Sequence, residues 1–478
     1  MKLLEPFELI KPYSDRLPEE CGVFGAYDTS RNDVTDALFY GLYALQHRGQ
    51  ESAGIATSNG EKISSHKNMG LVTEVFGDEG IDELIDEGHF GIGHVRYSTS
   101  GESQLINAQP LVISSKRGQM ALAHNGNLIN YKTLRDELLQ LGHINQTTLD
   151  TEVIAHLLAR YSEDTIESAI IKTTRWLKGS YALVMAVNDK LIGVRDPHGI
   201  RPLSLGKVGD MYVLSSETCA LDAVNGEFIR DILPGEMVVI NKDGIHSTMI
   251  EEKDHKKLCI FEFVYFARTD SHIDSISVYE ARARAGRILA KKAPVEADIV
   301  AGVPDSAITA AIGYSEESGI PYGEALAKNR YVGRTFIKPK QKIREQSVKV
   351  KLNALSRNVK GKRVVLVEDS IVRGTTSRNI VEMLRDAGAK EVHMRISSPP
   401  VKWPCFFGID TPSANQLIGS KNTVEEIRQL IGADSLEYLT PEDLLESVEG
   451  TKSQFCMGCF DNDYPISLDL ENQSFEDI

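Results

Sequence analysis

The chain has 478 residues, of which 41% are hydrophobic and 25% charged, and its formal net charge at pH 7 is −15. This length predicts two or three domains, and this composition is that of an ordinary globular protein. The negative charge argues against a general nucleic-acid binder, and no apolar run is long enough to cross a membrane. Residues 1–20 contain five acids and no sustained apolar core, so they do not form a secretory signal, and we expect a cytoplasmic protein.

Residues 21–250 are predicted to form an α+β domain in which antiparallel sheets are covered by helices. Short apolar runs predict strands at Cys21–Tyr27, Gly91–Tyr97, Ala121–His124, Tyr181–Val187 and Glu236–Ile240. Apolar residues at helical spacing predict helices at Val34–Gln46, Tyr131–Leu141, Thr151–Arg160 and Thr165–Leu177. Gly-Asp and Asp-Gly pairs predict hairpin turns at Gly209-Asp210 and Asp243-Gly244.

The charged segment Glu251–Lys257 is a candidate linker, and residues 258–465 are predicted to form an α/β domain with a parallel sheet. Its strands are expected at Asp298–Ala301, Val364–Val367 and Glu391–Ile396, with the ligand at their carboxyl ends. Thr440-Pro441-Glu442-Asp443 predicts a capping box at the start of a late helix. Residues 466–478 form an acidic tail.

Five short motifs follow one another in the first domain: Cys21–Gly25, Leu45–Gln50, Gly93–Thr99, His124–Asn127 and Asp150–Glu152. Each has a structural explanation when taken alone: Cys21 as a small buried hydrophobe, the histidines as core residues, Gly126 as a turn. Together and in this order they resemble the glutamine amidotransferases of the N-terminal-nucleophile hydrolase class. The resemblance covers residues 21 to about 240 and implies an αββα sandwich.

That resemblance implies cleavage of the Glu20–Cys21 bond, so that residues 1–20 are a leader. A free α-amine has a pKa of about 7.7–8.0 and can take the thiol proton of Cys21, which an internal peptide nitrogen cannot do. It also implies roles at the glutamine site: Cys21 as the nucleophile, Asn125 and Gly126 as the oxyanion hole, Arg96 for the α-carboxylate, and Asp150 for the α-ammonium. Arg48 and Gly49 are implied to help shape the pocket.

The segment Val364–Ser377 contains a second chemical pattern. Four apolar residues predict a buried strand, Glu368 and Asp369 end it, and a turn of small and hydroxyl residues leads into a helix. Backbone N–H groups converge on an anion at such a junction, and the two carboxylates can hold sugar hydroxyls or a hard metal ion. An ordinary strand-to-helix corner does not explain the acidic pair followed by two threonines. The segment resembles the 5-phosphoribosyl-1-pyrophosphate (PRPP) loop of the phosphoribosyltransferases.

The resemblance extends to Gly302–Ala307 and to Lys328–Phe336, a loop that closes over PRPP in the same family. The PRPP contacts that it implies are Asp305, Ser306, Lys328, Arg334, Glu368, Asp369, Ser370, Arg373, Gly374, Thr375 and Thr376. Ser306, Glu368 and Asp369 are implied to lie at Mg²⁺, which uses one or two carboxylates plus substrate phosphates. Glu368 is a departure, because the family usually has aspartate there.

A basic stretch from Lys338 to Arg363 holds ten Lys or Arg and one acid, Glu345. Two interpretations stand side by side: a solvated basic loop, or a basic flap over a polyphosphate.

Four of the six cysteines lie late in the chain: Cys259, Cys405, Cys456 and Cys459. Buried thiols, a zinc site and a [4Fe–4S] cluster all suit them, and spacing alone does not choose. Their surrounding segments resemble the iron–sulfur branch of the glutamine PRPP amidotransferases, which favours the cluster. Cys219 is expected to be structural.

Taken over residues 21–465, the resemblance to the glutamine PRPP amidotransferase family implies an allosteric enzyme of purine synthesis that makes 5-phosphoribosylamine, glutamate and pyrophosphate. It implies glutamine and PRPP as substrates, a shielded path for ammonia, purine nucleotides as feedback inhibitors, and a homotetramer or other homo-oligomer. Two rivals are another amidotransferase, such as a glucosamine-phosphate or asparagine synthase, and a non-enzymatic PRPP sensor. The Val364–Ser377 loop disfavours the first, and the intact glutaminase residues disfavour the second.

Overall fold

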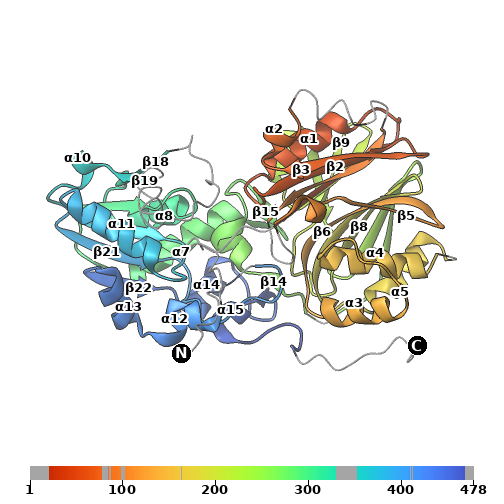
Figure 1. Ribbon diagram of the computed structural model, residues 1–478. Coiled ribbons are helices and arrows are strands. Elements are labelled where there is room, and N and C mark those ends of the chain that lie inside the picture. Colours follow the sequence, from red (N-terminus) through yellow and green to blue (C-terminus); the bar gives the residue numbers. More distant parts are fainter. Residues whose placement is uncertain are drawn as a thin grey trace, which may run out of the picture.

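The computed structural model describes residues 21–77, 84, 88–97, 103–162, 164–253, 255–329, 352–409, 411 and 413–468. The leader, Arg334, most of the basic stretch and most of the acidic tail lie outside the described residues. Figure 1 shows two halves side by side: residues up to about 250 form one, and the later residues form the other. No helix within the described ranges is long and apolar enough to span a membrane.

Two antiparallel sheets form the first half. One has seven strands in the order β11 (Glu227–Asp231), β9 (Ser204–Val208), β10 (Met211–Ser215), β1 (Gly22–Asp28), β4 (Phe90–Arg96), β2 (Ser52–Ser58), β3 (Ile63–Met69). The other has six strands in the order β13 (Gly244–Met249), β12 (Glu236–Asn241), β8 (Lys190–Arg195), β7 (Gly179–Val187), β6 (Gly118–Leu128), β5 (Leu111–Ser115).

Alternation along the strands explains why the sheets stack in four layers. In β1, Val23 points to a core between the two sheets, whereas Phe24 points to a core under helix α1. The outer face of the seven-stranded sheet carries α1 (Thr35–Ala44), α2 (Val72–Val75) and α6 (Cys219–Ala223). The outer face of the six-stranded sheet carries α3 (Tyr131–Gln140), α4 (Asp150–Arg160) and α5 (Ile166–Thr174). The predicted αββα sandwich is confirmed.

The second half is built on a parallel sheet in the order β17 (Ile299–Gly302), β20 (Arg363–Glu368), β21 (Glu391–Ile396), β22 (Ser435–Tyr438). Val365 and Val367 pack on one side against α7 (Val278–Lys292) and α8 (Ile308–Ser318). Val364 and Leu366 pack on the other side against α11 (Thr375–Asp386) and α13 (Val424–Ile431). Both faces are covered, as the apolar run of β20 predicts, and the predicted α/β domain is confirmed.

Shorter elements complete the second half. Three two-stranded pairs are β14 (Leu258–Cys259) with β23 (Phe455–Cys456), β15 (His272–Ile273) with β16 (Ile276–Ser277), and β18 (Leu326–Lys328) with β19 (Leu352–Ala354). The short helical segments are η1 (Leu105–Asn107), which belongs to the first half, and η2 (Glu262–Phe266), α10 (Ser356–Val359), η3 (Ala414–Gln416), α12 (Ile418–Lys421), α14 (Pro441–Ser447) and α15 (Gly458–Asp461). The capping box predicted at Thr440 and Asp443 begins α14.

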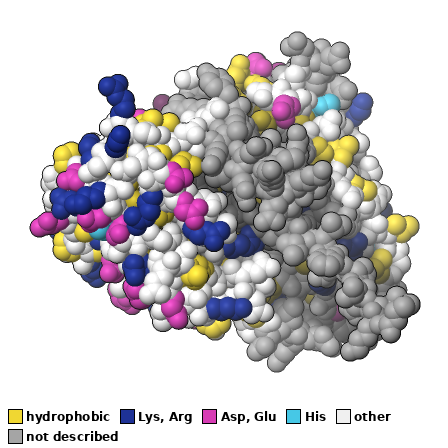
Figure 2. All heavy atoms as spheres, turned by 60° about the vertical axis from the view of Figure 1, so that its left-hand side comes forward, with side chains coloured by type: hydrophobic (Ala, Val, Ile, Leu, Met, Phe, Trp, Pro, Cys, Tyr) yellow, Lys and Arg dark blue, Asp and Glu magenta, His cyan; other side chains and the backbone are white. Residues whose placement is uncertain are grey.

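The described surface of the second half carries charges of both signs. In Figure 2 its Lys and Arg side chains lie interspersed with Asp and Glu side chains. A face that binds nucleic acid by its phosphates gathers positive charge instead. On this face the described residues form no patch of a single sign.

Candidate active site

Cys21 lies immediately before β1 and is buried. Its Sγ donates a hydrogen bond to the carbonyl of Tyr97 at 3.4 Å. Burial raises the pKa of the Cys21 thiol to about 11, against the smaller lowering effects of the Tyr97 contact and of Arg96. The thiol is therefore protonated at neutral pH, and it needs a base before it can act as a nucleophile.

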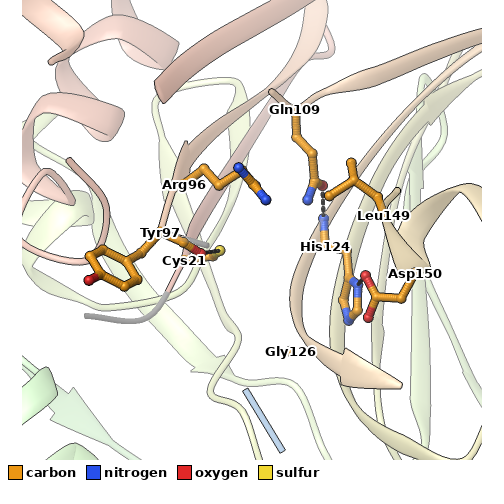
Figure 3. A pocket seen from close by; sticks show the side chains of 8 residues that line it. All are labelled: Cys21, Arg96, Tyr97, Gln109, His124, Gly126, Leu149 and Asp150. Carbon is orange, nitrogen blue, oxygen red and sulfur yellow. Dashed lines mark hydrogen bonds and ion pairs between the residues drawn. The ribbon is translucent and has the colours of Figure 1, made fainter. Parts of the chain in front are cut away.

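Cys21 opens onto a pocket that both sheets line. Figure 3 shows Cys21, Arg96 and Tyr97 on one side, and Gln109, His124, Leu149 and Asp150 on the other, with Gly126 below. In the first group, Cys21 precedes β1, and Arg96 and Tyr97 lie at the end of β4. In the second group, His124 lies on β6, Gln109 precedes β5, and Leu149 and Asp150 lie at the start of α4. The pocket thus brings together four residues predicted from separate motifs: Cys21, Arg96, Gly126 and Asp150.

Asn125 and Gly126 are adjacent residues of β6, and Gly126 lines the pocket. The Nδ2 of Asn125 is buried, and no described residue accepts its hydrogens. Gly126 has φ +146°, and a Cβ there would lie 2.2 Å from the Ser180 carbonyl oxygen, so only glycine fits. A buried amide donor without an acceptor costs free energy unless a ligand uses it, which suits an oxyanion hole.

Asp150 begins α4 and is held as a carboxylate. Its Oδ2 accepts from the backbone N–H of Leu128 at 3.0 Å, and its Oδ1 lies 3.6 Å from His124 Nδ1. Burial would raise the pKa of Asp150, but His124 and the backbone donors lower it below its usual value. Asp150 therefore offers a negative charge across the pocket from Arg96, which ends β4.

The Arg48 side chain lies behind Cys21 and is not among the residues that line the pocket. Its Nε donates to the Cys21 carbonyl at 3.1 Å, and its two terminal nitrogens bind Glu217 and Glu262. Gly49 does approach the site, because a Cβ there would lie 2.6 Å from the Arg96 backbone nitrogen. Arg48 thus holds the Cys21 backbone from behind.

Four pocket residues were not assigned roles from the sequence: Tyr97, Gln109, His124 and Leu149. Gln109 Oε1 accepts from the His124 backbone N–H at 2.8 Å, and so ties the segment before β5 to β6. His124 was noted only as part of a motif, and its ring lies against Asp150. No local sequence pattern singles out Gln109 or Leu149, because only the pairing of distant strands brings them to Cys21.

A second group of polar residues lies at the carboxyl ends of β17 and β20. Ser306 Oγ donates to Asp369 Oδ2 at 2.5 Å, and Ser370 Oγ donates to Asp369 Oδ1 at 2.6 Å. Asp369 is buried, so these hydroxyls hold its carboxylate in one orientation. The contact joins two motifs that are 63 residues apart in the sequence.

The remaining residues predicted for PRPP surround this pair. Lys328, at the end of β18, forms an ion pair with Asp305. Gly374 has φ +83° and directly precedes Thr375 and Thr376, the first residues of α11. Arg373 Nη2 donates to Gln416 Oε1 at 3.1 Å. The first turn of a helix has unpaired backbone N–H groups, so this loop can cradle an anion.

Glu368 is the last residue of β20 and is buried. Its backbone carbonyl accepts from the Ser397 N–H at 2.9 Å, which keeps it in register beside β21. Since side chains alternate along a strand, Glu368 continues the face of Leu366 rather than that of Val367. Asp369, not Glu368, accepts the hydrogen bond from Ser306 Oγ.

The four late cysteines converge on one apolar cluster of the second half. Cys259 and Cys456 are paired in the parallel strands β14 and β23. Burial and the neighbouring Cys405 raise the pKa of Cys456 to about 12, and burial with Cys405 and Cys456 also raises the pKa of Cys459 well above its usual value. No three His, Cys, Asp or Glu among the described residues are placed to hold a single metal ion. Each cysteine of a [4Fe–4S] cluster binds a different iron, so such a cluster does not require three side chains around a single metal ion.

Comparison with known proteins agrees with both sites. Residues 94–223 match the glutamine amidotransferase domain family, and residues 276–397 match the phosphoribosyl transferase domain family. The fold and the two sites thus define a glutamine amidotransferase joined to a phosphoribosyltransferase.

Relatives that align with nearly the whole chain identify the family within this class. The chain is 53% identical over 452 residues to the amidophosphoribosyltransferase of Archaeoglobus fulgidus, covering 94% of this chain and 98% of that protein. It is 50% identical over 457 residues to the one of Bacillus subtilis, covering 95% of each. The solved structure of the B. subtilis glutamine PRPP amidotransferase complexed with ADP and GMP matches with a TM-score of 0.89 at 48% identity, covering 95% of this chain and 99% of that one.

The chain belongs to the amidophosphoribosyltransferase family. Its reaction is the transfer of glutamine-derived ammonia to PRPP, which gives 5-phosphoribosylamine, glutamate and pyrophosphate and is the first step of purine synthesis. This family assignment over nearly the whole chain replaces the two rival functions drawn from the sequence, another amidotransferase and a PRPP sensor.

Proposed function

We propose that glutamine is hydrolysed in the pocket at Cys21 and that its ammonia is used at the Asp369 loop. The single observation that supports this most is the pocket itself, where a thiol, a guanidinium and a carboxylate face one another next to a buried, unused amide donor. Arg96 and Asp150 lie on opposite sides, so they can bind the α-carboxylate and the α-ammonium of glutamine. The carboxamide of glutamine then reaches Cys21.

The chemistry of the first step follows from the thiol. The sulfur attacks the carboxamide carbon, the carbonyl oxygen becomes an oxyanion, and ammonia leaves as the thioester forms. Asn125 Nδ2 and the Gly126 N–H would donate to the oxyanion, and loss of one such donor typically costs about 2.7–4 kcal/mol in the transition state. Water then hydrolyses the thioester to glutamate and restores the thiol.

The base in this proposal is the α-amine that appears when residues 1–20 are removed. The raised pKa of the Cys21 thiol supports this, because a buried thiol does not ionise by itself at pH 7. A free α-amine has a pKa near 7.7–8.0 and can accept the proton, directly or through a water. Intact-mass measurement of active enzyme should show a chain that begins at Cys21.

At the second site, the loop from Asp369 to Thr376 would hold PRPP. Asp369 would bind the ribose hydroxyls, and the first turn of α11 would bind the 5-phosphate. Asp305 and Lys328 lie at the edge of this loop, where they would face the leaving pyrophosphate. The transition state would be oxocarbenium-like, so the negative charge of the loop would also stabilise the ribose carbon.

Two metal groups belong to this proposal. The oxygen donors of Ser306 and Asp369 fit Mg²⁺, with Glu368 close behind in the chain, and Mg²⁺ would neutralise the pyrophosphate charge. Cys259, Cys405, Cys456 and Cys459 fit a group that takes thiolates, because all four lie together in one cluster. A [4Fe–4S] cluster is our choice, and it would stabilise the fold of the second half.

The relatives support a further element of regulation. One solved relative is complexed with ADP and GMP, and another is described as the allosteric regulatory enzyme of purine biosynthesis. We propose that purine nucleotides inhibit this chain as well and that it acts as a homo-oligomer. A nucleotide titration of the enzyme, with its mass measured in solution, tests both points.

One pair of assays tests the proposed function. The purified enzyme is given PRPP and Mg²⁺ with glutamine, and then with ammonium in place of glutamine. Phosphoribosylamine should form in both assays, and glutamate only in the first. If ammonium does not replace glutamine, the division of the reaction between two sites is wrong.

A further inference from the structure

A short segment of the second half, Cys405–Gly408, lies against the strands that carry the candidate oxyanion hole. The Phe406 carbonyl accepts from Asn127 Nδ2 at 2.8 Å. The Phe407 carbonyl accepts from Ser180 Oγ at 2.7 Å and from Arg201 Nε at 3.0 Å. These contacts join residues more than 200 positions apart in the sequence.

The donors of these hydrogen bonds are also the neighbours of Gly126. Asn127 and Ser180 are partners in the pairing of β6 with β7, and the Asn127 backbone N–H donates to Ser180 Oγ at 3.2 Å. The Ser180 carbonyl oxygen is the atom that a Cβ at Gly126 would meet. Ser180 therefore contacts Gly126 from one side and the Phe407 carbonyl from the other.

Gly408 brings the two backbones together directly. It has φ +112°, and a Cβ there would lie 3.3 Å from the Gly126 carbonyl carbon and 2.8 Å from Arg201 Nη2. Ser180, Arg201 and Phe407 are almost fully buried, so their hydrogen bonds have no competing water. The segment thus fixes the backbone on both sides of Gly126.

The direction of the Gly126 N–H matters because an oxyanion hole works only when its donors are already oriented. Gly126 has a conformation that other residues rarely adopt, and β6 alone does not dictate it. We propose that Cys405–Gly408 is a positioning element for the oxyanion hole, acting through Asn127 and Ser180. The second half thereby sets the rate at which the first half hydrolyses glutamine. This inference rests on the proposed roles of Asn125 and Gly126.

The test compares Asn127→Ala and Ser180→Ala with Ser204→Ala. Ser204 is a matched control, because it is a buried serine on β9 whose Oγ donates to Asp231 Oδ1 at 2.9 Å, away from the pocket. Three rates are measured on each protein: glutamate release from glutamine, phosphoribosylamine formation from ammonium, and alkylation of Cys21 by iodoacetamide. Alkylation displaces iodide and forms no oxyanion, so it reports the thiol alone.

We expect kcat for glutamate release to fall about tenfold or more in Asn127→Ala and Ser180→Ala, as for a donor that is displaced but not removed. These two variants should keep the parent values of three quantities: KM for glutamine, the rate of synthesis from ammonium, and the alkylation rate. Ser204→Ala should match the parent enzyme in every measurement. Unchanged kcat in both variants would overturn the proposal. So would an equal fall in kcat and in alkylation, because the damage would then lie at Cys21 or in the fold.

Asn125→Ala separates this inference from the function on which it rests. If Asn125→Ala keeps full glutaminase activity, the oxyanion hole is wrongly placed, and the inference fails with it. If Asn125→Ala loses activity while Asn127→Ala and Ser180→Ala keep it, the oxyanion hole stands and only the positioning by Cys405–Gly408 is wrong.

Discussion

Arg48 and Glu262 form a buried bidentate ion pair between the two halves of the chain, with Nη2–Oε1 at 2.8 Å and Nη1–Oε2 at 3.0 Å. The third nitrogen of the same guanidinium, Nε, donates to the Cys21 carbonyl at 3.1 Å. Both side chains are fully buried, and Glu217 accepts from Arg48 as well. A carboxylate of the second half therefore helps to fix Cys21, the proposed nucleophile.

Glu262→Gln tests this link, since it keeps the shape of the side chain and removes its charge. Removing one partner of a buried ion pair typically costs about 3–5 kcal/mol, so the thermal midpoint should fall. The kcat for glutamate release should fall too, because Arg48 is then held by Glu217 alone and the Cys21 carbonyl is less firmly fixed. Calorimetry and a glutaminase assay on one preparation check both expectations.

Asp274→Asn provides the control for that variant. Asp274 forms another buried ion pair between the halves, with Arg195 at 2.9 Å, and it does not contact the pocket. It should lower the midpoint and leave kcat for glutamate release unchanged. If Asp274→Asn and Glu262→Gln lower kcat alike, the effect is general loosening of the interface, and Glu262 has no particular part in placing Cys21.

His94 predicts how stability depends on pH. It is fully buried on β4, its Nε2 donates to the His124 carbonyl at 3.1 Å, and burial lowers the pKa of its imidazole to about 3. The unfolded chain binds this proton below a pKa of about 6.5, but the folded chain does not, so stability is complete above that pH and falls as the pH decreases. From pH 7 to pH 5, His94 should account for a loss of about 2 kcal/mol.

His94→Gln checks this expectation, because glutamine cannot take up the proton. The parent protein should lose more stability than the variant between pH 7 and pH 5, as measured by denaturant unfolding at each pH. Parallel losses in the two proteins would show that His94 is protonated in the folded chain.

The proposed cluster at the four late cysteines predicts the colour and the iron and sulfide content of the purified protein. Anaerobically purified protein should be brown and carry about four irons and four inorganic sulfides per chain. Cys456→Ser should lower the iron content and the thermal midpoint together, because ligand binding contributes to folding. Cys219→Ser, at a buried cysteine outside the cluster of four, should leave the iron content unchanged. Zinc without sulfide would show that the wrong metal was chosen.

Asp369→Asn tests the placement of the PRPP site. Asparagine has the shape of aspartate, so it can stay beside the Ser306 and Ser370 hydroxyls. It lacks the negative charge that would bind ribose hydroxyls or Mg²⁺. Phosphoribosylamine formation should fall sharply with glutamine and with ammonium, while basal glutamate release survives and its stimulation by PRPP weakens. Equal loss of both activities would mean that Asp369 supports the fold and not the substrate.

Much of the fold was predictable, because the signals are local. Apolar runs predict strands at Cys21–Tyr27 and Val364–Val367, and the structure has β1 and β20 there, each covered on both faces. The strand predicted at Ala121–His124 was too short, since β6 runs from Gly118 to Leu128. Asn125, Gly126 and Asn127 interrupt the apolar pattern, but pairing with β7 keeps them extended.

Site residues could be predicted from the sequence where the residue type itself suggests the chemistry. They could not be predicted where only the folding of distant segments brings a residue to the site. Cys21, Arg96 and Asp150 have side chains whose charge or reactivity suggests a role, and the structure brings them to one pocket. Arg48 was predicted only to help shape that pocket, and its contact with the Cys21 carbonyl could not be read from the sequence. Its partner Glu262 is 214 residues away and gives no signal in the sequence. Gln109 was missed for the same reason.

The most direct test of the central claim is Cys21→Ala, assayed for phosphoribosylamine with glutamine and with ammonium on one preparation. The account predicts that synthesis from glutamine disappears and synthesis from ammonium remains, because the second site uses ammonia and needs no thiol. Synthesis from glutamine that persists in Cys21→Ala would contradict the account, since another residue would then release the ammonia.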